Sequence, residues 1–198
     1  NRLKRQFCLY NVTMPSLTAV DNIFGSIIRG RLSDKLVPKA VADTAAKLTD
    51  ATIQLWQKTS AKMLPTPAKF HYMFNMRELS RVFAGIFEAP QNTLKDEVYL
   101  VKLWRHECER VFTDKLTNAG DKEWESNAIM NVVGDVFGQD LVSKCGGTCY
   151  FVNFLGDPII DDDGCVENAR PKLYEEAPTV DVVRAKALEF QFNHNEEN

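Results

Sequence analysis

Apolar residues recur at helical spacing through most of the chain before residue 140. The stretch after Pro15 predicts a first helix, because Ser16 is a suitable N-cap and Gly30 a suitable stop signal. Its apolar stripe consists of Val20, Ile23, Phe24 and Ile27. Residues at this spacing lie on one face of a helix, so we expect the segment to pack along one side.

A longer helix is predicted after Pro38. Pro65 and Pro67 disfavour a helical conformation for the residues before them, so the helix ends near that point. The segment KFHYMF that follows is expected to be short and extended. The stripe of this helix consists of Val41, Ala45, Leu48, Thr52, Leu55 and Thr59.

A capping box marks the start of a third predicted helix. Asn75 is the expected N-cap, Glu78 stands at the third helical position, and the helix stops before Pro90. Two more helices are predicted over about residues 94–117 and 121–138. The apolar face of the fourth consists of Val98, Val101, Trp104, Cys108, Val111 and Phe112. Five helices with short links predict a mainly α fold, a compact helical bundle.

The pattern changes at both ends of the chain. Residues 5–14 alternate loosely and are rich in β-branched and aromatic types, which predicts a short strand. After Gly138, short β-prone runs alternate with glycine, proline and an acidic turn, which predicts a hairpin or loose strands and an extended connector. The tail from residue 179 is expected to be helical at first. The bundle therefore carries a short β appendage.

Composition and charge exclude several classes of protein. Of the 198 residues, 44% are apolar and 26% charged, as in a globular protein with a real core. A net charge of −3 gives no electrostatic basis for binding nucleic acid. The apolar runs are far shorter than the roughly 20 residues that span a bilayer. The first residues, NRLKRQFCLY, contain no secretory signal and begin mid-pattern, so we expect a piece of a longer polypeptide.

The five cysteines are scattered along the chain. Cys108 falls on the apolar stripe of a predicted helix, which indicates a buried free thiol and a reducing compartment. Cys145, Cys149 and Cys165 are conceivable zinc ligands. However, CGGTC lacks the usual two-residue spacing and no nearby histidine completes a set of four. A Gly-Gly turn is the favoured interpretation, and no metal site is predicted.

Common catalytic motifs are missing from the sequence. It contains no phosphate loop of the form G-x-x-x-x-G-K-[ST], no dinucleotide fingerprint, no H-E-x-x-H and no G-x-S-x-G. The three histidines lie far apart in sequence and are expected to be surface or partly packed residues. DDDG at residues 161–164 lacks the glutamate of a calcium loop and is expected to be a polar turn.

Charged residues in three places call for an interpretation. In LWRHECERVF, residues 103–112, the charges are expected to form ordinary ion pairs on a helix surface. Arg2 and Arg5 stand at the entry to the predicted strand, and Arg77 and Arg81 at the entry to a helix. Arginine offers a planar fork that suits phosphate oxygens, and a helix start adds N–H donors. On local chemistry alone, each of these two arginine pairs is better explained as solvated surface than as an anion-binding site.

Several ordered motifs resemble the dynein heavy chain family, in an axonemal style. NRLKRQF before a proline and a helix comes first, then LPTPAKFHYMFNMRELSRVFAGIF, and then LVKLWRHECERVFTDKL. The second is similar to the family signature HYIF-N-RDLSR, and PKLYEEAP resembles the run that opens the fourth AAA+ module. The resemblance covers essentially the whole chain and points to the third AAA+ module of the motor ring.

The resemblance implies a division of the chain. Residues 1–15 would be the end of a large AAA+ subdomain and residues 16–140 a helical small subdomain. Residues 141–178 would be a β-rich appendage with the connector, and residues 179–198 the start of the next module. It also implies neighbouring AAA+ modules, microtubules and dynein light and intermediate chains as partners. The expected location is the cytoplasm and cytoskeleton, in the axoneme of a cilium or flagellum. No nucleic-acid or membrane partner is expected.

The same resemblance implies roles for the arginines. Arg77 matches the sensor-2 arginine, which reaches the γ-phosphate of the nucleotide in its own module, and Arg81 would support it. Arg2 matches best the arginine finger offered to the preceding module, with Arg5 as the alternate. The implied cofactor is ATP or ADP with Mg²⁺ in the full-length protein.

The chain departs from the family pattern in one important respect. The phosphate loop, the Walker-B acid and the sensor-1 residue are not in it, so we expect no ATP hydrolysis and no bound nucleotide from this chain alone. The alternative function is a non-enzymatic helical interaction domain whose arginines bind an acidic partner. A self-contained enzyme with an unrecognised site is disfavoured by the missing motifs.

Overall fold

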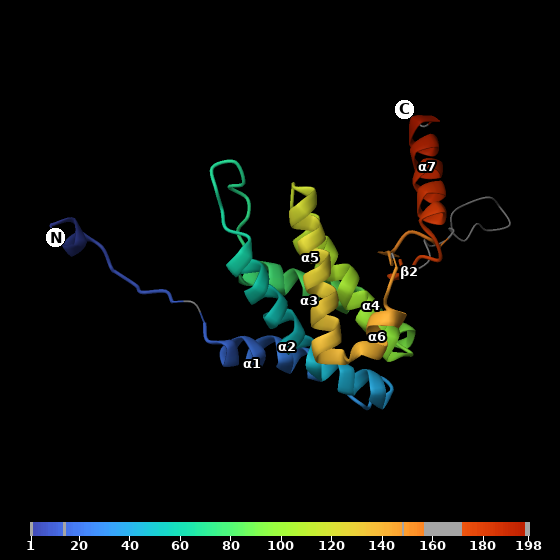
Figure 1. Cartoon of the computed structure of the whole chain (residues 1–198), viewed down its shortest axis with the longest axis horizontal. Helices are drawn as coiled ribbons and strands as arrows, with labels where there is room; N and C mark the ends of the chain where they lie inside the picture. The colour runs from blue at the N-terminus through green and yellow to red at the C-terminus, as the bar shows by residue number, and fades with distance from the viewer. Residues whose placement is uncertain (1, 14, 148, 157–171, 197–198) are drawn as a thin grey trace, which may run out of the picture.

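A computed structural model of the chain describes residues 2–13, 15–147, 149–156 and 172–196. Six helices build the main body (Figure 1): α1 (Leu17–Arg31), α2 (Lys39–Lys62), α3 (Met76–Glu88), α4 (Glu97–Cys108), α5 (Ala119–Val132) and α6 (Gln139–Lys144). Helices α4 and α5 each continue without a break into a π-helical turn, η3 (Glu109–Thr113) and η4 (Val133–Phe137). A short 3-10 turn, η2 (Gln91–Thr93), precedes α4. The predicted mainly α bundle is confirmed; only the short α6 was not predicted.

Helix α2 forms the centre of the bundle and packs against α1, α4 and α5. All six residues of its predicted stripe are buried. The Trp104 indole N–H of α4 donates a hydrogen bond of 2.9 Å to the Thr52 hydroxyl. The Thr52 hydroxyl in turn donates to the Leu48 carbonyl, so the indole N–H and this hydroxyl are both satisfied inside the core.

The stripe predicted for α1 is only partly correct. Ile23 and Ile27 are 52% and 50% exposed, whereas Val20 and Ile28 are buried. Because α1 packs mainly on α2 at the edge of the bundle, a single row of residues four apart faces inward. Phe24 belongs to this row and stacks on Phe83 of α3, with ring centroids 4.9 Å apart. The helix begins at the predicted cap, Ser16, and ends at Arg31, one residue after the predicted stop.

The strand predicted over residues 5–14 is not formed. Leu3–Gln6 is a short 3-10 turn, η1, and no strand pairing is present among described residues 7–13. Figure 1 shows this segment leading away from the bundle. A strand needs a neighbour to accept its backbone hydrogen bonds, and the described part of the chain places none beside it. The β-prone composition is therefore not sufficient here.

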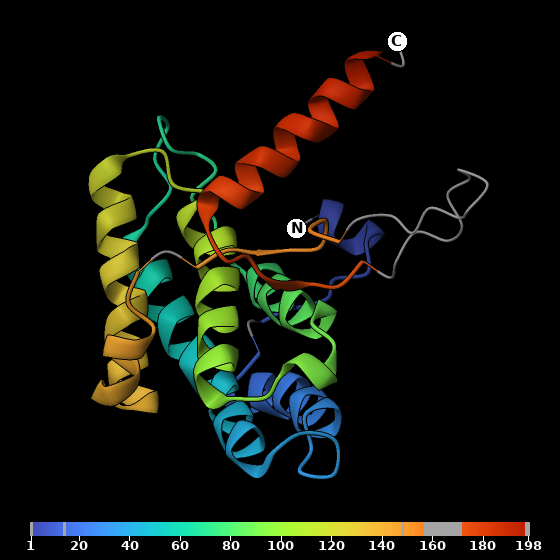
Figure 2. The ribbon, with the colours of Figure 1, turned by 90° about the vertical axis from the view of Figure 1, so that its right-hand side faces the viewer.

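A small antiparallel pair follows the bundle. Strands β1 (Phe151–Val152) and β2 (Glu175–Glu176) pair with Phe151 opposite Glu176, which confirms that strands follow Gly138. In Figure 2 these segments cross α4 before the chain enters the last helix, α7 (Val180–Glu196), which projects from the body. The acidic turn and Cys165 lie outside the described residues. No helix in the described ranges is long and apolar enough to cross a membrane.

Candidate functional site

The predicted capping box fixes the first turn of α3. The Asn75 side-chain oxygen accepts the Arg77 backbone N–H at 2.9 Å, and the Glu78 carboxylate accepts the Asn75 N–H at 2.9 Å. This reciprocal pair satisfies donors that a helix start leaves open. It therefore sets the backbone from which the Arg77 side chain projects.

Glu78 also ties α3 to the end of η3. Its carboxylate lies 3.1 Å from the Lys115 ammonium, and Lys115 donates to the Met73 carbonyl as well. Burial opposes ionisation of Glu78, but the Asn75 N–H and the Lys115 ammonium together hold the pKa of this carboxyl below its usual value. The start of α3 is thus held by a charged, hydrogen-bonded brace.

Arg77 and Arg81 are both exposed, one turn apart on α3. In the ranges that the structure describes, neither guanidinium makes an ion pair. On the opposite side of the helix, Leu79 and Val82 are fully buried. The amphipathic pattern of α3 therefore presents two arginines to the surroundings while the helix stays anchored in the core.

A hollow of about 570 Å³ lies beside this face, between α3 and the turn after α4. Its charged lining is mixed, with cationic side chains from Arg81, Arg110 and Lys115 and the carboxylates of Glu88 and Asp114. The mixture gives the hollow no strong charge of one sign. Arg81 therefore shares this hollow with two acidic side chains, whereas Arg77 is not part of its lining.

Arg2 and Arg5 lie on the segment that leads away from the bundle (Figure 1), at and within η1. Both are exposed. The structure does not bring them together with Arg77 and Arg81, which stand on α3 inside the helical body. The two arginine clusters are therefore separate features of this chain.

The charged residues at the end of α4 form ion pairs one turn apart, as the sequence predicts, but the prediction of a solvated surface is wrong for Glu107 and Arg105. The Glu107 side chain is completely buried, and that of Arg105 is only 12% exposed. Arg105 pairs with Glu109 at 2.8 Å and also donates to the carbonyls of Cys145 and Gly147. The sequence pattern could not reveal this, because the covering segment follows α4 by about 40 residues.

The Glu107 carboxylate is the centre of this covered surface. Its Oε1 accepts the Tyr174 hydroxyl, and its Oε2 accepts Arg110 Nη2 at 2.8 Å and Nε at 3.1 Å. Burial together with the nearby carboxylate raises the pKa of Tyr174 well above its usual value, so the phenol stays protonated and donates. A buried carboxylate is tolerable here because both of its oxygens are paired.

The β pair and its flanks lie against the same surface of α4. Lys102 pairs with Glu176 at 2.8 Å, and the Ala177 N–H donates to the Tyr150 carbonyl at 2.7 Å. The His106 ring contacts Phe151 and Tyr174, with centroids 5.6 and 6.4 Å away. Burial lowers the pKa of His106, which makes it a packed neutral ring, in line with the sequence-based prediction.

Comparison with known proteins adds the family to this geometry. Residues 48–144, from the middle of α2 to the end of α6, match the AAA+ lid domain family. A dynein gamma chain of the flagellar outer arm from Chlamydomonas reinhardtii is 41% identical over all of this chain. The chain is homologous to axonemal dynein heavy chains. The mouse dynein axonemal heavy chain 5 is 40% identical over 98% of it, and a ciliary dynein beta chain from Heliocidaris crassispina 34% over 80%.

The chain spans only 4–5% of the length of these dynein relatives. The identities over the chain nevertheless confirm, at the level of the family, the resemblance to dynein heavy chains that the motifs indicated. The lid match also agrees with the helical bundle that carries Arg77 and Arg81. Which AAA+ module the chain corresponds to, and where its subdomains begin and end, stay predictions.

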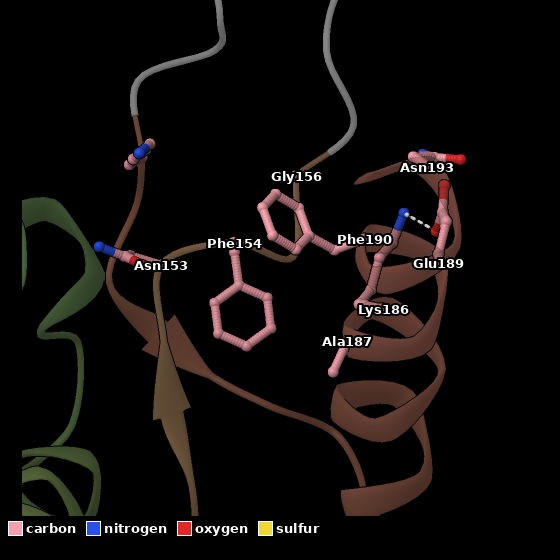
Figure 3. A pocket seen from close by; sticks show the side chains of 9 residues that line it. Asn153, Phe154, Gly156, Lys186, Ala187, Glu189, Phe190 and Asn193 are labelled. Carbon is pink, nitrogen blue, oxygen red and sulfur yellow. Dashed lines mark ion pairs between the residues drawn. The ribbon is translucent and has the colours of Figure 1, made fainter. Parts of the chain in front are cut away.

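A second hollow of this dynein-related chain lies at its C-terminal end. Between the β pair and α7 lies a hollow of about 530 Å³, into which the Phe154 and Phe190 rings project (Figure 3). Its wall on α7 includes the Lys186–Glu189 ion pair of 3.2 Å. The lining is mainly apolar and brings together no catalytic pair.

In the described part of the chain Cys8 is exposed, whereas the other three cysteine thiols are buried and have packing roles. Cys108 is buried and free, as predicted. Cys149 Sγ donates to the Lys102 carbonyl at 3.6 Å, and Cys145 Sγ contacts the Val98 carbonyl. Burial raises the pKa of Cys149 to about 11, which favours the neutral thiol. The described residues contain no cluster of three or more potential metal ligands.

Proposed function

We propose that this chain is the lid-side part of one AAA+ module in the motor ring of an axonemal dynein heavy chain. There it contributes nucleotide sensing and inter-module coupling to ATP-driven, microtubule-based movement in a cilium or flagellum. Similarity to flagellar and axonemal dyneins over the whole chain supports this, as does the lid-domain match over the bundle. The alternative, a free-standing helical interaction domain, is not favoured by that similarity.

The observation that carries the sensing role is the arrangement of Arg77 and Arg81 on α3. Both guanidinium groups are exposed, while the capping box and the Lys115 brace hold the helix that bears them. The cap already uses the Arg77 backbone N–H, so an approaching phosphate would be met chiefly by the guanidinium group. These residues fit a nucleotide held elsewhere in the full-length chain.

Bound ATP with Mg²⁺ would supply the phosphoryl group and its charge. Arg77 would contact the terminal phosphate as a sensor, and Arg81 would support it one turn further along α3. Such a contact lowers the energy of charge on the phosphate oxygens and makes the lid position depend on the nucleotide. Arg2, with Arg5 as the alternate, would serve as an arginine finger toward the preceding module.

We further propose that the chain corresponds to the third module and the start of the fourth. Residues 1–15 would close the large subdomain, residues 16–140 form the small one, residues 141–178 the appendage and connector, and residues 179–198 open the next module. Its partners would be the neighbouring modules, microtubules through the whole motor, and dynein light and intermediate chains. The motif order supports the module assignment.

The test is Arg77→Ala in the full-length heavy chain that contains this segment. We expect the affinity of the lid's own module for ATP to fall by about ten- to a hundredfold, because a charge-assisted contact to phosphate is worth roughly 1.5–3 kcal/mol. Nucleotide binding is followed with a fluorescent ATP analogue, and microtubule-stimulated turnover is measured alongside.

Arg184→Ala, which removes an exposed arginine from α7, is the matched control and should leave both measurements unchanged. Arg81→Ala should give a smaller loss than Arg77→Ala. Equal nucleotide affinity in the Arg77→Ala and Arg184→Ala motors would refute the sensor role.

A further inference from the structure

Three segments that are distant in the sequence meet at the Glu107 carboxylate. Besides Tyr174 and Arg110, Glu107 touches the backbone of α3 at Gly85: a Cβ added there would overlap the carboxylate atoms. Gly85 is itself buried and has ordinary helical backbone. A glycine is therefore required at this position by the close approach of α3 to Glu107, not by its own conformation.

The three contacts leave the carboxylate little freedom. Glu107 is fully buried on α4, with α3 against one side and the Tyr174 hydroxyl on Oε1. If α3 moves toward α4, the carboxylate must move as well, and the bond to Tyr174 is lost. Because packed interiors do not deform continuously, such a displacement favours two discrete arrangements.

Tyr174 is the main anchor of the connector, which we define as residues 172–179 between the undescribed segment and α7. It is only 8% exposed, whereas the neighbouring Leu173 is 43% exposed. The connector is also tied to the bundle side by the Lys102–Glu176 pair, with both side chains 27% exposed, by the Ala177 N–H bond to the Tyr150 carbonyl, and by the two-residue β pair. Among these ties, the Tyr174–Glu107 hydrogen bond is the side-chain contact with a completely buried acceptor, so its loss should loosen the connector measurably.

We propose that Gly85, Glu107 and Tyr174 form a contact relay through which a shift of α3 changes how firmly α4 holds the connector. Helix α3 bears Arg77 and Arg81, and the connector leads directly into α7. The relay therefore joins the proposed sensor helix to the segment that would enter the next module. Its link to nucleotide rests on the proposed function, but the contact relay itself is a property of the folded chain.

Coupling between two places in a protein is reciprocal, and this gives the relay a sharp test. In the described part of the chain Tyr174 makes no hydrogen bond with α3, so its contact with the α3 backbone at Gly85 runs through Glu107. Tyr174→Phe keeps the ring and removes the hydroxyl. Amide hydrogen exchange of the 198-residue chain, without nucleotide, should become about tenfold faster both in the connector and in residues 82–88 of α3.

Gly85→Ala perturbs the relay from the other end. The added methyl group displaces Glu107, so exchange in the connector should accelerate as it does for Tyr174→Phe. Two matched controls are available. At Gly30 an added Cβ meets nothing, so Gly30→Ala should change neither region, and Tyr150→Phe removes a hydroxyl from a half-exposed ring.

Each outcome decides the proposal. If Tyr174→Phe loosens the connector but leaves α3 unchanged, Tyr174 is an anchor and the relay is wrong. If Gly85→Ala unfolds the chain, the Tyr174→Phe result alone decides. Failure of the relay leaves the sensor role of Arg77 untouched, and normal nucleotide binding by an Arg77→Ala motor leaves the relay untouched, so the two can fail separately.

Discussion

At the scale of single residues, Glu125 is the buried acid with the least support. It is completely buried on α5; its Oε1 accepts the Thr59 hydroxyl at 2.7 Å, and its Oε2 has no partner among the described residues. Burial raises its pKa to about 7, only partly offset by the Thr59 hydrogen bond. The neighbouring Cys108 thiol of α4 stays neutral because burial raises its pKa well above its usual value, and in the described part of the chain no positive charge offsets the burial of Glu125.

Glu125 should make the stability of the bundle depend on pH. Its folded pKa of about 7 lies above the unfolded value of 4.5, so the folded state binds more protons between these values. Stability should therefore fall as pH rises from about 4.5 to 7, by about 3 kcal/mol for this group alone. Glu125→Gln should remove this slope and be the more stable protein at pH 8, measured by urea denaturation across the pH range.

Comparing two variants isolates this effect from other titrating groups. Glu123→Gln changes an exposed acid two residues earlier on α5 and should keep the wild-type slope. His106, whose pKa is lowered by burial, titrates alike in all three proteins and cancels in the differences. Parallel curves for wild type and Glu125→Gln between pH 4.5 and 7 would contradict the assignment.

At the scale of elements, the capping box of α3 is a local device with a measurable share of stability. Asn75→Ala removes the side-chain acceptor of the Arg77 N–H and should lower the free energy of unfolding by about 1 kcal/mol. Chemical denaturation measures the loss. Ser80→Ala, on the exposed side of the same helix, is the control and should change stability by less than half as much. A loss no larger than in that control would show that the cap is dispensable.

Elements followed from the sequence where the signal was local. The capping box at Asn75 and the long stripe of α2 both depend on neighbouring residues along one helix, and both were predicted correctly. The α1 stripe was partly wrong because it depends on how many helices pack against α1. The strand at residues 5–14 was wrong because pairing requires a second strand that composition cannot supply.

In the candidate site, too, the local features were predictable from the sequence and the long-range contacts were not. The exposure of Arg77 and Arg81 on one face of α3 was predictable from helical spacing. The burial of Glu107 was not, because its partner Tyr174 is 67 residues away and Gly85 belongs to a third segment. A glutamate within a run of charged residues gives no sign that a distant tyrosine covers it.

At the scale of the whole molecule, the protection of backbone amides from hydrogen exchange should differ widely between elements. Helix α7 makes few contacts with the bundle, and its Leu188, Phe190 and Phe192 are 57%, 75% and 61% exposed. In hydrogen exchange of this chain, α7 and residues 2–13 should exchange within the earliest times, whereas α2 and α4 exchange only through global unfolding. Protection of α7 equal to that of α4 would mean that another surface covers it, which sedimentation would test as self-association.

The β1–β2 pair has a consequence for how such chains tolerate variation in length. Phe151 and Val152 are fixed directly beside Glu176 and Glu175, so the two ends of the intervening segment are clamped next to each other. The entropic cost of joining two positions depends only weakly on the number of residues between them, since doubling that number costs about 0.6 kcal/mol. Insertions between these strands that leave the Tyr174–Glu107 contact in place should therefore be nearly neutral for the bundle, which makes this stretch a natural site for a genetically inserted reporter.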